Sequence, residues 1–262
     1  MGEGGGTAAE ELLERLVEQF ASPYDFLREL VQNAMDAGSD RVDVELHVHR
    51  DGDDDEVVFE IAVADAGSGM DQQCIDAELT RLFASSKRLD RTMAGGFGVG
   101  FVSIFAWAPA CVLVQTGCRG EAWEIEFDAQ RRFTRRKLVD PIEGTTVRSF
   151  KAGRASEADA IAEQVRASLW RWCRFCRVDL GFTYAGKHER IHEEPPPDDE
   201  ALAISHRAAD TYVRVEFGEP AKVVLRRHGL VLAEGTPAVH LPAELRASWP
   251  HLQVWADSPA LS

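Results

Sequence analysis

The strongest constraint on the fold comes from residues 111–150, where short segments of alternating apolar and polar residues follow one another with only short turns between them. Alternation with a period of two is typical of a strand with one buried face. Short turns join antiparallel neighbours. The segments CVLVQTG, EAWEIEFD, RRFTRRKL and GTTVRSF therefore predict an antiparallel meander, in a sheet of about five to seven strands.

Other segments predict helices and further strands. Residues 24–37 repeat apolar side chains at helical spacing, and Gly38 suits the end of a helix. A second helical pattern covers residues 156–172, whereas RVDVELHVH, VVFEIAVAD and RVDLGFTYAG have strand character. The chain therefore mixes helices with a sheet.

The composition changes near residue 190. KHERIHEEPPPDDE is charged and rich in proline, as linkers are. Beyond it, YVRVEF, KVVLRR and LVLAEG predict short strands that are too few for a complete domain. We expect a first domain over residues 1–190, a linker over 191–205, and the start of a second domain over 206–262.

Charge and cysteine content narrow the possible partners. The chain has 29 Lys and Arg against 44 Asp and Glu, a net charge of -15 that disfavours nucleic acid and anionic lipid surfaces. Neither a basic leader nor an apolar run of about 20 residues is present, so we expect a cytoplasmic protein without membrane contact. The five cysteines lack zinc-ligand spacing, and the pair Cys173 and Cys176 is interpreted as structural.

Three polar residues share one face of the first predicted helix. Glu29, Asn33 and Asp36 are spaced at i, i+4 and i+7, which brings their directions within about 60 degrees of one another. An amide between two carboxylates is costly to bury without a metal ion or ligand. A solvated polar face explains the same triplet.

Two glycine-rich segments can bring backbone close to a ligand. Asp65-Ala66-Gly67-Ser68-Gly69 follows a strand, so the Asp65 carboxylate can accept a hydrogen bond from an exocyclic amine, although a structural turn also fits. The segment from Gly95 to Gly100 precedes an apolar helix, which directs backbone amides at an anion such as phosphate. It matches neither the P-loop nor the Rossmann fingerprint, and a flexible hinge is the alternative.

Together with Gly144-Thr145 at a strand start, these motifs occur in the order that resembles the GHKL nucleotide-binding superfamily. Within it, FLRELVQNAMDAG, DAGSGM and GGFGVGFVSIF look most like the N-terminal ATPase domain of the heat-shock protein 90 chaperone family. The resemblance covers about residues 10–185. It implies an α+β, Bergerat-type two-layer α/β sandwich with a mixed, mainly antiparallel sheet, followed by a small partial second α/β region.

The resemblance also implies roles for single residues. Glu29 would be the general base that activates water, held idle by an ion pair with Arg28, and Asn33 would bind Mg²⁺. Asp65 would accept the adenine amino group. Residues 71–94 would form a mobile lid over the nucleotide. Further nucleotide contacts are implied for Asp36, Gly69, Met70, Lys87, Gly95, Gly98, Val99, Gly100, Phe101 and Thr145.

The implied function is that of a chaperone-like ATPase, which binds ATP or ADP with Mg²⁺ and uses hydrolysis to close its lid and form a homodimer acting on client proteins. One alternative is a nucleotide-gated binding module with little turnover, and another is a mismatch-repair or topoisomerase-type ATPase. The end of the chain resembles the family segment just before an arginine-bearing loop, so we expect slow turnover.

Overall fold

The computed structural model describes residues 14–15, 17–18, 22–50, 52, 55–80, 99–194, 203–208, 211–217, 222–235 and 252–258. The chain divides into two compact units. The first consists of residues 1–169 and 178–190, and the second of residues 170–177 and 191–262. In the described residues, no helix is both long and apolar enough to cross a membrane.

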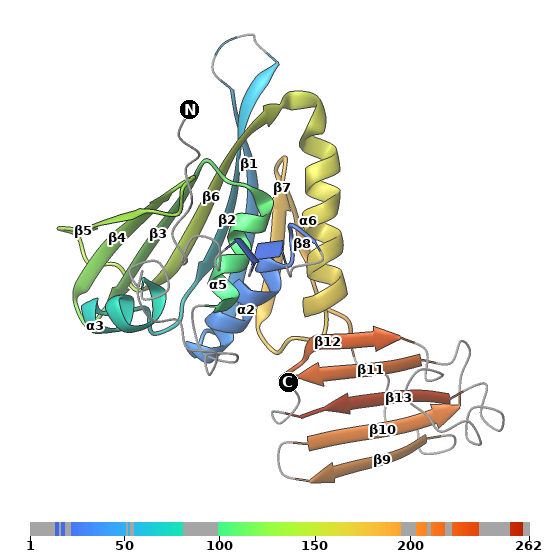
Figure 1. Ribbon diagram of the computed structural model, residues 1–262. Coiled ribbons are helices and arrows are strands. Elements are labelled where there is room, and N and C mark those ends of the chain that lie inside the picture. Colours follow the sequence, from blue (N-terminus) through green and yellow to red (C-terminus); the bar gives the residue numbers. More distant parts are fainter. Residues whose placement is uncertain are drawn as a thin grey trace. The chain divides into compact units, whose positions relative to one another are not determined.

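An eight-stranded sheet forms the framework of the first unit, in the order β5-β4-β3-β6-β2-β1-β7-β8 (Figure 1). Its strands are β1 (Arg41–Arg50), β2 (Glu56–Asp65), β3 (Cys111–Cys118), β4 (Glu121–Asp128), β5 (Phe133–Lys137), β6 (Gly144–Arg154), β7 (Asp179–Tyr184) and β8 (Lys187–Arg190). Neighbours pair antiparallel except β1 and β7, which pair parallel. The sheet is therefore mixed and mainly antiparallel, which confirms the predicted fold class.

Two details of the sheet differ from the prediction. The strands β3, β4 and β5 do form a meander, but β6 returns to pair with β3 and β2. The eighth strand, β8, is KHER, the last four residues of the predicted first domain, for which the charged composition did not predict a strand. It pairs only with β7, and an edge strand needs no apolar face to satisfy its backbone hydrogen bonds. A pattern search based on buried faces therefore misses it.

Helices cover one face of this sheet (Figure 1). They are α2 (Phe26–Asp36), α3 (Gln72–Cys74), the π-helical turn η1 (Ile75–Leu79), α5 (Val99–Val102), the 3₁₀ turns η3 (Ser103–Trp107) and η4 (Ala155–Glu157), and α6 (Ala158–Cys173). The apolar side of α2 is buried through Phe26, Leu27, Leu30, Val31 and Ala34. The helix ends at Asp36, and Gly38, the predicted terminating residue, follows with a φ of 77° that few other residues adopt readily.

The alternation along each strand separates a buried face from a polar one. Val42, Val44 and Leu46 of β1 are at most 3% exposed, while Asp43 and Glu45 between them are partly exposed on the opposite face. Burying apolar side chains on one face only, under a layer of helices, produces the two-layer sandwich. The space between these layers is where a ligand can enter.

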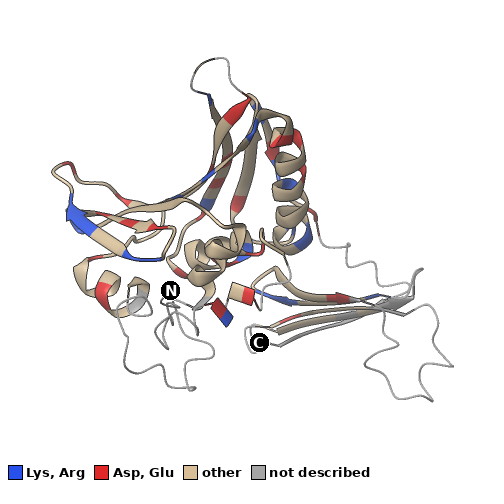
Figure 2. Ribbon diagram, turned by 45° about the horizontal axis from the view of Figure 1, so that its top comes forward, with Lys and Arg blue, Asp and Glu red and all other residues tan. Residues whose placement is uncertain are grey.

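The β5 edge of the sheet is rich in basic residues (Figure 2). Arg135 is paired with Asp76, Arg136 lies 2.6 Å from Glu124, and Lys137 lies 3.0 Å from Glu121. Such partly exposed pairs contribute little stability each. Their main consequence is that the positive charge of β5 is largely compensated by acidic neighbours.

The second unit contains a five-stranded sheet in the order β12-β11-β13-β10-β9 (Figure 1). Its strands are β9 (Ala203–Ala208), β10 (Thr211–Phe217), β11 (Lys222–Arg227), β12 (Leu230–Gly235) and β13 (Leu252–Asp257). Phe175, Val224, Val231 and Trp255 form its core. Cys173 and Cys176 are buried residues of this unit. Strand β9 begins at Ala203, inside the segment that the sequence assigns to a linker.

Candidate functional site

A cavity of about 320 Å³ lies between α2 and the large sheet in the first unit. This volume is within the range of small-molecule sites. Seven residues predicted to contact a nucleotide line it, namely Asn33, Asp36, Asp65, Gly69, Met70, Phe101 and Thr145. Its apolar wall is formed by Leu30, Val63, Leu79, Val114 and Val147. Polar groups at few points in an apolar wall are typical of a site that orients a flat ligand.

Asp65 is the carboxylate at the end of β2 and faces this cavity. It accepts a hydrogen bond from the Gly67 backbone N–H at 2.8 Å. Burial raises the pKa of Asp65, and the backbone N–H groups of Gly67 and Thr145 oppose part of that rise. The carboxylate is thus a partly desolvated acceptor held in one orientation by its own loop.

Glycines allow three chain segments to pack closely beside Asp65. Gly69 has a φ of 62° and Gly144 a φ of 78°, conformations that glycine adopts without steric cost. A Cβ on Gly69 would overlap the Gly117 carbonyl oxygen, and a Cβ on Gly144 would overlap the Asp65 carbonyl oxygen. These glycines are therefore needed for backbone packing, whatever the ligand.

Thr116, which the sequence analysis missed, does not line the cavity but contacts Met70 and Thr145, which do. Its side chain is completely buried, and its hydroxyl accepts a hydrogen bond from the Met70 backbone N–H at 2.9 Å. The same hydroxyl lies 3.2 Å from the Gly144 carbonyl oxygen and 3.0 Å from the Thr145 hydroxyl. The sequence does contain a feature that could have identified it. Thr116 is a polar residue at an inward position of β3, where the other inward residues are Val112 and Val114.

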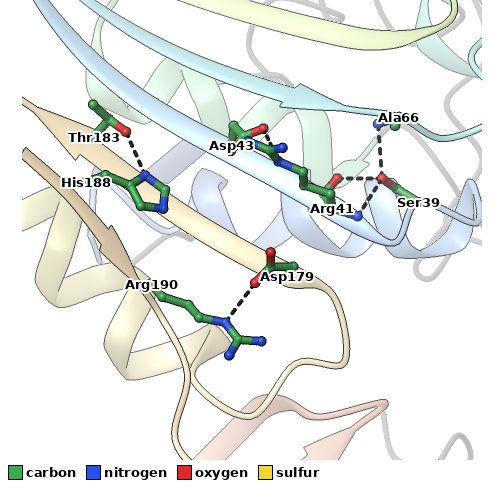
Figure 3. Close-up of polar contacts among 8 residues, drawn as sticks. All are labelled: Ser39, Arg41, Asp43, Ala66, Asp179, Thr183, His188 and Arg190. Atoms are coloured by element: carbon green, nitrogen blue, oxygen red, sulfur yellow. Dashed lines mark hydrogen bonds and ion pairs between the residues drawn. The ribbon is translucent and has the colours of Figure 1, made fainter.

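Ser39, a buried residue between α2 and β1, was also missed. Its hydroxyl donates to the Arg41 carbonyl at 2.6 Å and accepts from the Ala66 N–H at 3.1 Å (Figure 3). Nearby, the Ser68 N–H donates to the Ala37 carbonyl at 2.9 Å. These bonds fasten the loop after Asp65 to the end of α2.

Glu29 and Arg28 lie on α2 and are not among the residues that line the cavity. Arg28 donates to one Glu29 carboxylate oxygen from Nε at 3.0 Å and from Nη2 at 2.6 Å, so the expected ion pair is present. A Cβ on Gly100 would overlap the Glu29 carboxylate. The predicted base therefore lies against the start of α5, at the end of the glycine-rich segment.

Asn33 and Asp36 of α2 both line the cavity. Asp36 accepts from the Gln32 side-chain amide at 2.9 Å and is exposed. Among the described residues, no three His, Cys, Asp or Glu side chains gather as a metal site. A Mg²⁺ ion that is shared with phosphates needs only one or two protein oxygens.

Part of the predicted site cannot be placed. Lys87, Gly95 and Gly98 lie outside the described residues, as does most of the predicted lid, of which the structure describes only α3, η1 and the residues adjoining them up to Thr80. Val99 begins α5. The roles of all these residues stay predictions.

Residues 22–156, more than half of the 262-residue chain, match the family described as "Histidine kinase-, DNA gyrase B-, and HSP90-like ATPase". The DNA mismatch repair protein MutL of Pseudomonas aeruginosa is 26% identical over 272 residues, which cover 97% of this chain and 37% of that protein. MutL of Nitrobacter winogradskyi is 32% identical over 196 residues, which cover 69% of this chain and 29% of that protein.

The chain thus spans well under half the length of these relatives. Their names give no support to the narrower resemblance to the heat-shock protein 90 chaperones. They agree with the broader resemblance, in which an Asn-bearing helix, D-x-G-x-G and a glycine-rich segment occur in a fixed order. The chain belongs to the family of histidine kinase-, DNA gyrase B- and HSP90-like ATPases.

Proposed function

We propose that this chain binds ATP with Mg²⁺ and hydrolyses it, as the ATPase module of a mismatch-repair-type protein. One observation carries the proposal: a single cavity collects Asp65 from β2, Thr145 from β6 and Asn33 from α2. Sequence motifs that lie up to about a hundred residues apart are thereby brought to one site.

The Asp65 end of the cavity suits adenine. An ionised carboxylate only accepts hydrogen bonds, so it favours the exocyclic amine of adenine. Guanine presents a carbonyl group at the corresponding position, which would set two acceptors against each other. The apolar wall of Leu30, Val63 and Val147 gives the flat base a surface on which to pack.

The α2 end suits phosphates and Mg²⁺. Asn33 and Asp36 line the cavity here, and both carry side-chain oxygens, the type of ligand that Mg²⁺ prefers. When bound, the ion would neutralise phosphate charge. In this proposal Asn33 holds it, and backbone amides at the start of α5 lie on the phosphate side.

Glu29 is the proposed base, because its carboxylate lies beside the start of α5 and can take a proton from an attacking water. In the structure this carboxylate is bound by Arg28. That contact favours a second candidate function, a nucleotide-gated binding module with little turnover, in which Arg28 keeps Glu29 from acting as a base.

We propose mismatch repair over chaperone activity because the relatives are named as DNA mismatch repair proteins. A role in DNA repair is consistent with a cytoplasmic location and with a nucleotide-dependent homodimer. Direct DNA contact by β5 is not favoured, because its cations are already paired with acids. On the names of the relatives, the proposed partners are a second copy of the chain and DNA, in spite of a net charge of -15 that by itself disfavours nucleic acid.

The first experiment is calorimetry of ATP and GTP binding in the presence of Mg²⁺, together with a phosphate-release assay. We expect ATP to bind, GTP to bind at least tenfold more weakly, and phosphate to be released from ATP. Equal affinity for the two nucleotides would contradict the role of Asp65. Binding without phosphate release would favour the nucleotide-gated module.

The second experiment separates repair from chaperone activity. Turnover is measured alone, with a DNA duplex, and with an unfolded protein at equal mass. A repair-type ATPase is expected to respond to DNA and to ignore the unfolded protein. A response to the unfolded protein alone would restore the chaperone hypothesis.

A further inference from the structure

The Thr116 hydroxyl contacts three protein groups, two of which belong to the cavity-lining residues Met70 and Thr145. It accepts from the Met70 N–H at 2.9 Å, and it lies 3.2 Å from the Gly144 carbonyl oxygen and 3.0 Å from the Thr145 hydroxyl. Thr116 is 0% exposed. Its hydrogen bonds are therefore made with these three protein groups.

The number of hydroxyl protons and lone pairs determines how the three contacts are arranged. A hydroxyl has one proton and two lone pairs, and the Met70 N–H already uses one lone pair of Thr116. If Thr116 donated to Thr145, its contact with the Gly144 carbonyl would not be a hydrogen bond. If Thr116 donates to Gly144, the Thr145 hydroxyl donates to Thr116, and all three contacts are hydrogen bonds. Buried polar groups favour the arrangement that satisfies more of them.

In that arrangement Thr145 uses its proton inside the wall. Thr145 also lines the cavity. In this arrangement its hydroxyl offers only lone pairs to a ligand. Asp65 is the cross-strand partner of Thr145, and its carboxylate is an acceptor too. This corner of the cavity therefore presents two acceptors side by side.

We propose that Thr116 is a positioning residue that turns Thr145 into a hydrogen-bond acceptor, so that this corner selects a purine with an amino group at C6 over one with a carbonyl group there. The proposal rests on the proposed function, since it names how that nucleotide site recognises its base. It assigns to Thr116 an effect on selectivity, which a purely structural residue would not have.

The test compares ATP with inosine triphosphate, which carries a carbonyl group in place of the C6 amine. Calorimetry gives the ratio of the two affinities for the wild-type chain, Thr116→Val and Thr116→Ser. Valine keeps the shape but removes the hydroxyl. The Thr145 hydroxyl can then donate a hydrogen bond to the C6 carbonyl group of inosine triphosphate. We expect Thr116→Val to lower the ratio of ATP affinity to inosine triphosphate affinity about three- to tenfold. Serine keeps the hydroxyl and should keep the wild-type ratio.

If Thr116 had a merely structural role, Thr116→Val would weaken the binding of both nucleotides equally and leave the ratio of their affinities unchanged. That result would overturn the proposal. If Thr116→Val does not fold, Thr145→Val answers the same question, because it removes the acceptor that Thr116 orients. An unchanged ratio in that variant overturns the proposal as well. A wild-type chain that shows no preference for ATP would overturn the proposed function itself, whereas a wild-type preference that survives Thr116→Val would overturn only this inference.

Discussion

The two ends of the cavity are built in different ways. The Asp65 end consists of strand ends and tight loops, in which Gly69 and Gly144 leave no room for a side chain and Thr116 is completely buried. The α2 end consists of one helix face, on which Asn33 and the exposed Asp36 line the cavity. Glu29, on the same helix but outside the lining, is bound to a neighbouring arginine. A rigid wall suits selection among ligands, whereas a helix face beside solvent can exchange ion pairs during a reaction.

Replacing Glu29 by Gln should have the largest effect and act on the α2 end alone. Loss of a general base typically lowers turnover by about 10² to 10⁴-fold. ATP affinity should change less than about threefold, because a base acts on water in the transition state and not on bound nucleotide. Phosphate release and calorimetry measure the two quantities. Hydrolysis at the wild-type rate would remove Glu29 from the mechanism.

Asp65→Asn should act on the other end and weaken ATP binding by about a hundredfold. The Gly67 N–H keeps the side-chain oxygen, so the new NH₂ group opposes the adenine amine with a donor, and the partly buried charge is lost. Asp36→Asn is the matched control, since Asp36 lines the same cavity but is exposed. We expect a loss of less than tenfold there. Similar losses in both variants would mean that the two ends do not differ as described.

Gly69→Ala should test the packing of the Asp65 end without any ligand. Its Cβ would overlap the Gly117 carbonyl oxygen at a φ of 62°, so we expect a loss of about 2–4 kcal/mol in unfolding free energy. Gly38→Ala is the control, because Gly38 has a φ of 77° but nothing within 4 Å of a Cβ. There we expect only the backbone cost of about 1 kcal/mol. Equal losses in denaturant titrations would show that the close packing is not rigid.

The smallest expected effect is on the titration of Asp65. Burial raises its pKa, so the folded chain binds this proton more tightly than the unfolded chain, and this group's contribution to stability falls as pH rises through the raised pKa. Bound ATP should act in the opposite direction, because an amine that donates to the carboxylate stabilises its charged form. ATP affinity should therefore fall as pH decreases through this pKa. Carboxyl NMR titration with and without nucleotide checks the sign, and a pKa that rises on binding would exclude the hydrogen bond to adenine.

Local patterns in the sequence predict much of the fold. The helical period identifies α2 and its polar face, and alternation identifies β1, β2 and β7 as strands. The motifs carry the resemblance to the GHKL superfamily, and seven of the residues for which that resemblance implies nucleotide contacts line the cavity. Each of these inferences depends on residues that are neighbours in the chain, which is why short segments suffice.

The sequence by itself therefore determined the type of the elements that have a clear period, such as α2, β1 and β2, and the face that each of them buries. The tertiary structure decided the strand order, in which β6 lies between β3 and β2, and with it the contact between Thr116 and Thr145. It also decided that Glu29 lies against Gly100 and that Ser39 fastens the loop after Asp65. Periodicity shows which way a side chain faces, but its partner depends on which distant segments pair, and that is settled by packing of the whole sheet against its helices.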